Sequence, residues 1–272
     1  MDRAGREKEV KSLAQLRDLT GRKVLLTGGA GHIALAASES LIELGATVML
    51  LDRDADACEA RAKKLGAHAL PIGCDLKDEK AVRTAARQSI DKLGGLDILI
   101  HCAAYVGTTK APGWSAPFEE QTVSAWNDAM AINVTAAFVL AQESRDALTK
   151  SGRGSIILLN SIYGMLGPKM ALYAGTEMFN PVAYGVSKGG LLQLMRYLAT
   201  TLAPSVRVNC ISVGGVLRDQ PKEFRQRYEA DTPLRRMATE EDAKGAIAYL
   251  ASDLSAYVTG HNLIVDGGWS AW

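Results

Sequence analysis

Cysteine and histidine are scarce in this chain, and neither is spaced as a metal site or a disulfide framework would require. The 272 residues include 4 cysteines, with no CxxC pair, and 4 histidines, with no HExxH spacing. Zinc ligands recur at such short spacings. We therefore expect no metal ion, and we interpret the four cysteines as reduced, small apolar side chains.

An excess of charge of one sign is also missing. The chain has 31 Lys and Arg against 30 Asp and Glu, which leaves a formal net charge of +1. Proteins that bind nucleic acids usually carry a basic excess or a basic stripe. We therefore expect no nucleic-acid partner.

Long apolar runs are lacking as well. A membrane-spanning helix needs about 20 predominantly apolar residues, and no such run is found by reading the sequence. The first residues, MDRAGREKEVKSLAQLRDL, are too charged for a signal peptide. These features predict a cytoplasmic protein without a membrane partner.

What the sequence does contain is a regular alternation of short aliphatic runs and longer helical stretches. Runs that are apolar throughout, without strict alternation, are typical of strands buried on both faces of a parallel sheet. Strands and helices that alternate along a chain predict a doubly wound α/β sheet with helices on both faces. We predict seven strands, at 23–27, 47–51, 67–72, 96–100, 155–160, 206–212 and 262–266. We predict helices at 32–44, 54–65, 77–92, 118–131, 133–150, 182–202 and 239–251.

The pattern predicts one domain over residues 21–272, because no stretch resembles an interdomain linker. Residues 1–20 are predicted to form an N-terminal arm with an extra helix. Two longer irregular segments follow strands, an insertion loop at 163–181 and a substrate loop at 213–238. Loops of this length beside the carboxyl ends of strands are commonly functional.

The stretch KVLLTGGAGHIALAASESL reads as a strand, a glycine-rich turn and a helix. Gly28, Gly29 and Gly31 allow a sharp turn and close approach of the backbone to a ligand. The helix that follows presents free N–H groups to a pyrophosphate. The turn therefore indicates dinucleotide binding, with a purely structural turn as the alternative. His32 either caps the helix start or approaches the pyrophosphate.

An acidic residue follows the second predicted strand. Asp52 lies 21 residues beyond Gly31, a distance that suits a carboxylate accepting the ribose hydroxyls of an adenosine. Such a carboxylate repels a 2′-phosphate, so the sequence favours NAD over NADP. Arg53 next to it could accommodate a 2′-phosphate, and a plain turn residue is the other interpretation of Asp52.

The stretch PVAYGVSKGGLL places a tyrosine and a lysine on one face of a helix. Pro181 suits a first turn, and Tyr184 and Lys188 stand at i and i+4. A free tyrosine has a pKa of about 10. A neighbouring cation and an oxidised nicotinamide ring both favour the phenolate. We therefore expect Tyr184 to act as an acid/base, although taken alone the pair could also be two surface residues.

Taken together and in order, TGGAGHIA, Asp52, CDL at 74–76, Asn133, Ser161, Tyr184 and Lys188 resemble the short-chain dehydrogenase/reductase family over residues 20–268. The resemblance implies a Rossmann-like fold and an NAD(P)-dependent oxidoreductase of secondary alcohols and ketones. The insertion, the GGAGHI turn and the DGGW tail are similar to bacterial members that modify flagellin or surface glycans, which implies a sugar or sugar-derived substrate.

The resemblance also implies the site. Tyr184 would exchange a proton with the substrate oxygen, Lys188 would bind the nicotinamide ribose and lower the pKa of the phenol, Ser161 would bind the substrate oxygen, and Asn133 would complete a proton relay. The implied cofactor contacts are Gly28, Gly31, His32, Ile33, Asp52, Arg53, Asp75, Leu76, Ala103, Tyr184, Lys188, Gly214 and Val216. The family's pattern is broken by His101, Cys102 and Ala104 after the fourth strand, and by Val213 and Arg218 after the sixth.

Three further expectations complete the hypothesis. Ser161 and Tyr184 are 23 residues apart, further than is usual in the family, so the insertion is either a substrate wall or lid or an oligomer contact. Apolar faces on the helices at 118–150 and 182–202 predict a homodimer or homotetramer. The alternative functions are a carbonyl or 3-oxoacyl reductase and a nucleotide-binding scaffold without catalysis.

Overall fold

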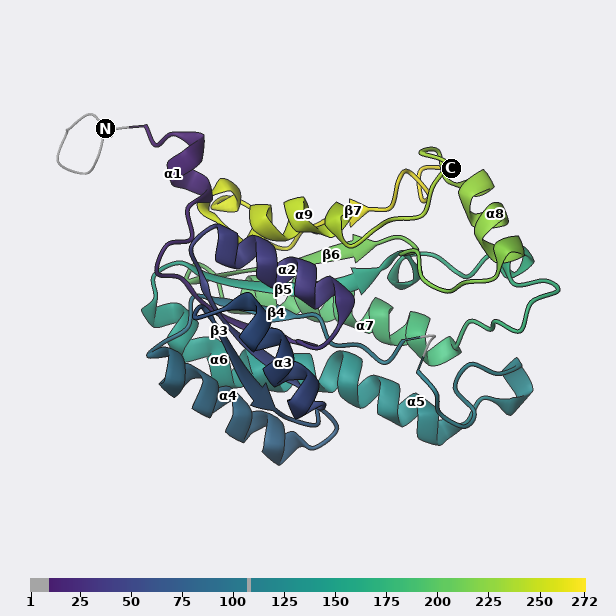
Figure 1. Ribbon diagram of the computed structural model, residues 1–272, viewed down its shortest axis with the longest axis horizontal. Coiled ribbons are helices and arrows are strands. Elements are labelled where there is room, and N and C mark those ends of the chain that lie inside the picture. Colours follow the sequence, from purple (N-terminus) through teal and green to yellow (C-terminus); the bar gives the residue numbers. More distant parts are fainter. Residues whose placement is uncertain (1–9, 107–108) are drawn as a thin grey trace.

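One parallel sheet organises the chain. The computed structural model describes residues 10–106 and 109–272, and within them seven strands pair in the order β3-β2-β1-β4-β5-β6-β7 (Figure 1). Every predicted strand is present, with ends that differ from the prediction by two residues at most. The strands are β1 (Lys23–Thr27), β2 (Thr47–Asp52), β3 (Ala69–Gly73), β4 (Ile98–His101), β5 (Gly154–Ser161), β6 (Val206–Val213) and β7 (Asn262–Val265).

Helices cover both faces of this sheet (Figure 1). One apolar core lies beneath α2 (His32–Glu43), α3 (Ala55–Leu65) and α9 (Glu241–Ala251). The other lies beneath α4 (Glu79–Leu93), α6 (Ala136–Lys150) and α7 (Val182–Thr201). Successive strand residues divide between the two cores: Val24 and Leu26 belong to the first, and Leu25 belongs to the second. The predicted single-domain, doubly wound α/β fold is confirmed.

The strand order reverses beside β1, which is flanked by β2 on one side and β4 on the other. The chain passes outward from β1 to β2 and β3, and it then returns to build the other half of the sheet from β4 to β7. Loops from the two halves therefore separate at the carboxyl ends of β1 and β4. In sheets of this type, that separation opens the crevice in which ligands bind.

Helix α2 begins differently from its neighbours. Asp54 caps α3 by accepting a hydrogen bond from Ala57 N at 2.9 Å, and Asp78 caps α4 in the same way through Lys80 N and Ala81 N. The N-cap of α2 is Gly31, which has no side chain to offer. The first N–H groups of α2 therefore remain available at the crevice, where the positive end of the helix dipole favours an anion.

The helical region at 118–150 differs from the two predicted helices. Its first part is a 3-10 turn, Phe118–Glu120, after which Thr122 caps α5 (Val123–Met130). Helix α5 then continues without a break into α6 through five residues of π-helix, Ala131–Thr135. The predicted interruption near 132 is therefore wrong. A π segment widens the helix by an inserted residue and often marks a functional position.

Helix α8 (Lys222–Asp231) lies inside the segment predicted to be a substrate loop at 213–238. Its sequence, KEFRQRYEAD, is strongly polar, and only Phe224 and Tyr228 are buried. The predicted insertion at 163–181 is irregular except for two 3-10 turns, Ile162–Gly164 and Met170–Leu172. Both segments border the crevice, as their positions after β5 and β6 predict.

The described part of the N-terminal arm contains α1 (Leu13–Arg17), which Ser12 caps through Gln15 N at 3.2 Å. Residues 1–9 of the predicted arm lie outside the described residues. Arg22 Nη2 and Lys11 Nζ both reach the Asp253 carboxylate, at 2.5 and 3.3 Å. The Lys11 ion pair therefore attaches the arm beside the end of α9, where Arg22 of the domain meets the same carboxylate.

The continuous helix Val123–Lys150 is long and apolar enough to cross a membrane, judged by length and composition alone. In its most apolar window, however, 44% of the residues are buried inside the molecule. It packs against α4 and the sheet, as a core helix of this fold does.

Candidate active site

A cleft of about 820 Å³ opens at the carboxyl ends of the strands and runs from the glycine turn to Tyr184. All thirteen residues predicted to bind the cofactor line this cleft. Of the four predicted catalytic residues, Ser161, Tyr184 and Lys188 line it, whereas Asn133 is fully buried behind it. The sequence motifs, which are up to 188 residues apart in the chain, are thus brought to a single surface.

The glycine turn forms one wall of the cleft, and its backbone has no room for side chains. Gly28 has a left-handed backbone with φ of 75°, and a Cβ atom there would stand 2.8 Å from the backbone of Ala103. Gly31 N donates to Gly28 O at 2.8 Å, which closes the turn just before α2. A tight backbone followed by an uncapped helix N-terminus is suited to a pyrophosphate. The donor set therefore fits a dinucleotide.

Asp52 ends β2 at the far end of the cleft. Its Oδ2 accepts from Ala30 N at 3.0 Å and its Oδ1 accepts from Asp54 N at 3.1 Å, so the carboxylate also holds the glycine turn. Each carboxylate oxygen has a further lone pair, which leaves capacity for the hydroxyls of a ribose. Arg53 is exposed and borders the same part of the cleft.

Thr27 holds the backbone after β4 in place. Its Oγ1 accepts from Cys102 N and Ala103 N, each at 3.2 Å, which fixes Ala103 against Gly28. Asp75 is exposed and lines the cleft beside Leu76, and its Oδ1 accepts from Lys77 N at 3.0 Å. Thr27 belongs to the quoted TGGAGHIA motif, but its role as an acceptor was not predicted.

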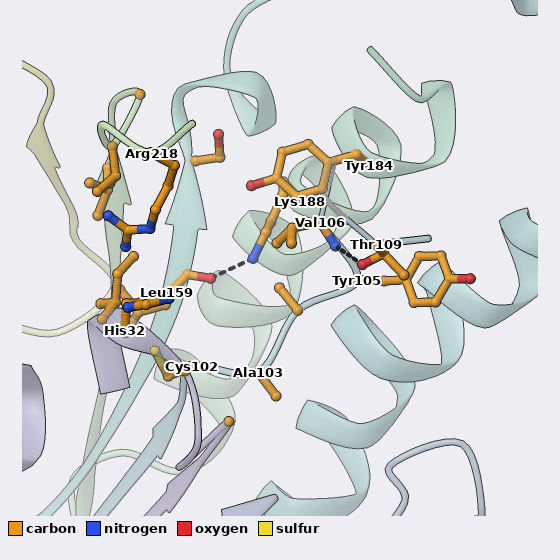
Figure 2. A pocket seen from close by; sticks show the side chains of 18 of the residues that line it. His32, Cys102, Ala103, Tyr105, Val106, Thr109, Leu159, Tyr184, Lys188 and Arg218 are labelled. Atoms are coloured by element: carbon orange, nitrogen blue, oxygen red, sulfur yellow. Dashed lines mark hydrogen bonds between the residues drawn. The ribbon is translucent and has the colours of Figure 1, made fainter. Parts of the chain in front are cut away.

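The Tyr184 hydroxyl points into the cleft from the first turn of α7, with the Lys188 ammonium close by (Figure 2). Lys188 Nζ lies 5.8 Å from the centroid of the Tyr184 ring and donates to Leu159 O at 2.7 Å. Burial lowers the pKa of Lys188 to about 8, so the ammonium form predominates at neutral pH. The predicted pairing of phenol and cation on one helix face is present.

In the protein alone, burial has a larger effect on the pKa of the Tyr184 phenol than Lys188 has. Burial raises the pKa of Tyr184, and a hydrogen bond from the Ser161 side chain lowers it only in part. Lys188 is directed at the Leu159 carbonyl rather than at the phenol, so desolvation of the phenolate is the larger effect in the protein alone. The sequence-based expectation combined Lys188 with the positive ring of an oxidised nicotinamide, and with that cofactor bound it stays a prediction.

Asn133 lies within the π segment and joins three parts of the site. Its Oδ1 accepts from Tyr105 N at 2.6 Å, and its Nδ2 donates to Ser187 Oγ at 2.8 Å. Ser187 Oγ donates in turn to Tyr184 O at 2.8 Å. Asn133 therefore connects the loop after β4 with the backbone of α7 under Tyr184, which places it behind the site rather than in contact with a ligand.

His101 replaces a residue of the family pattern and is fully buried at the end of β4. Its Nδ1 pairs with Thr27 Oγ1 and its Nε2 with Ile132 O, each at 3.1 Å. Burial and the nearby Lys188 charge lower the pKa of His101 to about 3, so its ring is neutral. This ring links β1 to the π segment.

The loop after β6 brings a cation to the α2 end of the cleft. Arg218 and His32 lie on the same side of the cleft (Figure 2). Both face Glu240 Oε1, with Arg218 Nη1 at 2.8 Å and His32 Nδ1 at 3.9 Å. Gly214 N donates to Val265 O at 2.9 Å, and Val216 pairs with Ala238 beside it. The predicted loop residues Gly214 and Val216 are thus anchored at the cleft.

Comparison with known proteins gives one family match over most of the chain. A family model described as enoyl-(acyl carrier protein) reductase matches residues 28–270. D-arabinitol 2-dehydrogenase (ribulose-forming) of Scheffersomyces stipitis is 32% identical, over 93% of this chain and 95% of that protein.

Solved structures agree with this match. A short-chain type dehydrogenase/reductase from Mycobacterium marinum superposes with a TM-score of 0.84 at 29% identity, over 96% of this chain and all of the other. A short-chain dehydrogenase from Leptospira borgpetersenii with bound NAD+ superposes with a TM-score of 0.81 at 30% identity, over 97% of this chain and 98% of the other.

Proposed function

Because the chain belongs to the short-chain dehydrogenase/reductase family, we propose that it oxidises a polyhydroxylated secondary alcohol with NAD and uses Tyr184 as the acid/base. As a member, it is an NAD(P)-dependent oxidoreductase that acts on CH–OH groups. The observation that carries the proposal is the meeting of Ser161, Tyr184 and Lys188 in the same cleft as the glycine turn and Asp52.

The roles of the side chains follow from their positions. When bound in this cleft, an oxidised nicotinamide would supply the hydride acceptor for the carbinol carbon and a positive charge near the phenol. That charge is needed because burial raises the pKa of Tyr184 in the protein alone. Tyr184 Oη then takes the proton of the substrate hydroxyl, while the Ser161 hydroxyl donates to the same substrate oxygen. Lys188 supplies a second positive charge near the phenol.

Asp52 supports NAD as the cofactor. Its carboxylate closes the ribose end of the cleft and would repel a 2′-phosphate. A relative of 30% identity binds NAD+. We infer that the choice between NAD and NADP depends on Asp52, which lines the cleft next to Arg53.

Replacing Asp52 by Asn keeps the shape of the side chain and removes its charge. We expect the Kd of NADH to rise about tenfold, since a charge-assisted hydrogen bond is lost, and the Kd of NADPH to fall or stay constant. Fluorescence titration of both reduced cofactors measures this. An equal loss for the two would show that Asp52 does not select the cofactor.

A polyol substrate is supported by the D-arabinitol dehydrogenase among the relatives. It is also consistent with the sugar-like substrate that the surface-glycan resemblance predicts. Purified protein should first be titrated with NADH and then assayed with NAD against pentitols, hexitols, aldoses and monohydroxy secondary alcohols. Turnover of polyols is expected. Reduction of 3-oxoacyl thioesters or simple ketones alone would favour the reductase alternative, and cofactor binding without any turnover would favour the scaffold.

A cytoplasmic homodimer or homotetramer completes the proposal. Apolar side chains exposed on the helix Val123–Lys150 and on α7 support assembly, because such side chains are usually covered by a partner.

A further inference from the structure

Two phenols of the insertion, those of Tyr163 and Tyr173, lie next to each other at the cleft. Tyr163 Oη and Tyr173 Oη are 2.8 Å apart, and both side chains line the cleft. Asn180 Nδ2 donates to Tyr173 Oη at 2.9 Å from outside the cleft lining. The proposed acid/base chemistry uses neither phenol.

Counting hydrogens shows that this pair is incomplete. Two phenols carry two O–H hydrogens, and the bond between them uses one. The Asn180 amide only donates to Tyr173, so it takes up none of them. Within residues 10–106 and 109–272, neither phenol oxygen has another acceptor within hydrogen-bond distance. One O–H donor therefore remains for a group that enters the cleft.

The pair is held firmly against the reacting centre. Tyr163 N donates to Ser161 Oγ at 3.2 Å, so both residues belong to one tight turn. That turn packs on α7, where a Cβ on Gly164 would stand 2.8 Å from Lys188 O. Tyr184 is close enough to contribute to the raised pKa of Tyr163.

The other phenol is fixed by a row of aromatic rings. Tyr173 packs on Phe224 at 5.2 Å between ring centroids, Phe224 on Tyr228 at 6.1 Å, and Tyr228 on Trp269 at 5.8 Å. Arg227 Nη1 also donates to the backbone of the insertion at Leu172 O, at 3.2 Å. The insertion is therefore clasped by α8 and the C-terminal tail, which orients Tyr173 before any ligand binds.

We propose that the paired hydroxyls of Tyr163 and Tyr173 bind a second hydroxyl of the substrate, on a carbon adjacent to the carbinol held by Ser161 and Tyr184. This inference rests on the proposed function and narrows its substrate to vicinal diols, including polyols and sugars. A monohydroxy alcohol leaves the phenol donor without an acceptor, and a site that is built to bind a hydroxyl selects against such a substrate.

The test uses Tyr163→Phe and Tyr173→Phe, which remove one hydroxyl each, with the fully exposed Tyr257→Phe as the matched control. The probes are the polyol of the panel with the highest kcat/KM and the secondary alcohol of the same chain length, for example D-arabinitol and 2-pentanol. For each of the two variants we expect kcat/KM for the polyol, divided by that for the monohydroxy alcohol, to fall about tenfold. The control should keep the ratio of the unaltered protein.

A second measurement does not depend on turnover. The Kd of the polyol for the complex with NADH should rise about tenfold in the two variants, while the Kd of NADH itself stays constant and reports that they are folded. Equal losses for both alcohols, or an unchanged polyol Kd, would overturn the inference and leave the proposed function standing. An unaltered protein that oxidises none of the alcohols would instead contradict the proposed function.

Discussion

At the scale of single residues, the Tyr184 hydroxyl is the group through which a proton must pass. It points into the cleft, and the Ser161 side chain hydrogen bonds to it. Tyr184→Phe should lower kcat by at least about a hundredfold, because general acid–base catalysis is lost. The Kd of NADH should change less than about twofold, since the ring remains. Steady-state kinetics and fluorescence titration measure the two effects, and substantial turnover in this variant would exclude Tyr184 as the acid/base.

Lys188 carries a cost in stability that can be measured. Burial lowers its pKa from the ordinary value of 10.5 to about 8. Between these values the unfolded chain binds the proton more tightly than the folded protein does, so the free energy of unfolding of the cofactor-free protein should rise with pH. The full rise from this group is roughly 3 kcal/mol.

Lys188→Met should abolish that rise, because methionine fills a similar space without a charge. Urea unfolding of the two proteins at pH 7 and pH 10 isolates the contribution, since other titrating groups cancel in the difference. Activity should fall as well, because the cation beside Tyr184 is gone. Parallel pH dependences of the two proteins would show that folding does not lower the pKa of Lys188.

Which site residues could be predicted depends on how local their determinants are. Tyr184 and Lys188 are on one helix, and Asp52 ends a strand, so spacing and periodicity were sufficient to place them. The partners of Asn133, by contrast, come from Tyr105 and Ser187, and only the folded chain shows them. The direction of the pKa shift of Tyr184 was not predictable either, because burial cannot be read from a pair of residues.

At the scale of elements, the glycine turn separates two costs of adding a side chain. One is the strain of a left-handed backbone, and the other is a clash with a neighbouring segment. Gly28 and Gly152 have similar φ values, of 75° and 71°. A Cβ at Gly152 would meet nothing within 4 Å, whereas a Cβ at Gly28 would stand 2.8 Å from Ala103. Gly152→Ala should therefore cost about 1 kcal/mol of stability, from the left-handed backbone alone.

Gly28→Ala should cost roughly a further 1–3 kcal/mol, because the turn must move away from Ala103. It should also weaken NADH binding, which Gly152→Ala should leave intact. Thermal unfolding and cofactor titration of the two variants provide the comparison. Similar losses of stability in both would contradict the close packing of the turn.

Elements with strong apolar patterns were predicted well, and those held together by distant contacts were not. Each strand is a short aliphatic run, so its place could be read directly. Helix α8 lacked such a run: its buried Phe224 and Tyr228 are an i, i+4 pair in a polar sequence, and they pack on Tyr173 and Trp269. That pair was the available signal. The π segment has no comparable signal, because Ala131–Thr135 would also suit an α-helix.

At the scale of the whole molecule, the proposed dimer or tetramer rests on exposed apolar side chains. Val123 and Phe138 on the helix Val123–Lys150, and Val182, Val186 and Tyr197 on α7, are all more than one third exposed. We expect light scattering to give the mass of a dimer or tetramer. The double variant Phe138→Glu/Val186→Glu should lower that mass, and Tyr257→Glu should not. If the unaltered protein is a monomer, these two helix faces are not subunit interfaces.

The π segment Ala131–Thr135 determines what a single-residue deletion in this helix would do. Removing one residue there would let the backbone return to ordinary α-helical winding, and the apolar stripe of α6 would stay on the strands it covers. Asn133, however, would leave the widened turn, and its side chain would lose its contacts with Tyr105 and Ser187. The helix should therefore tolerate a single-residue deletion that the active site does not.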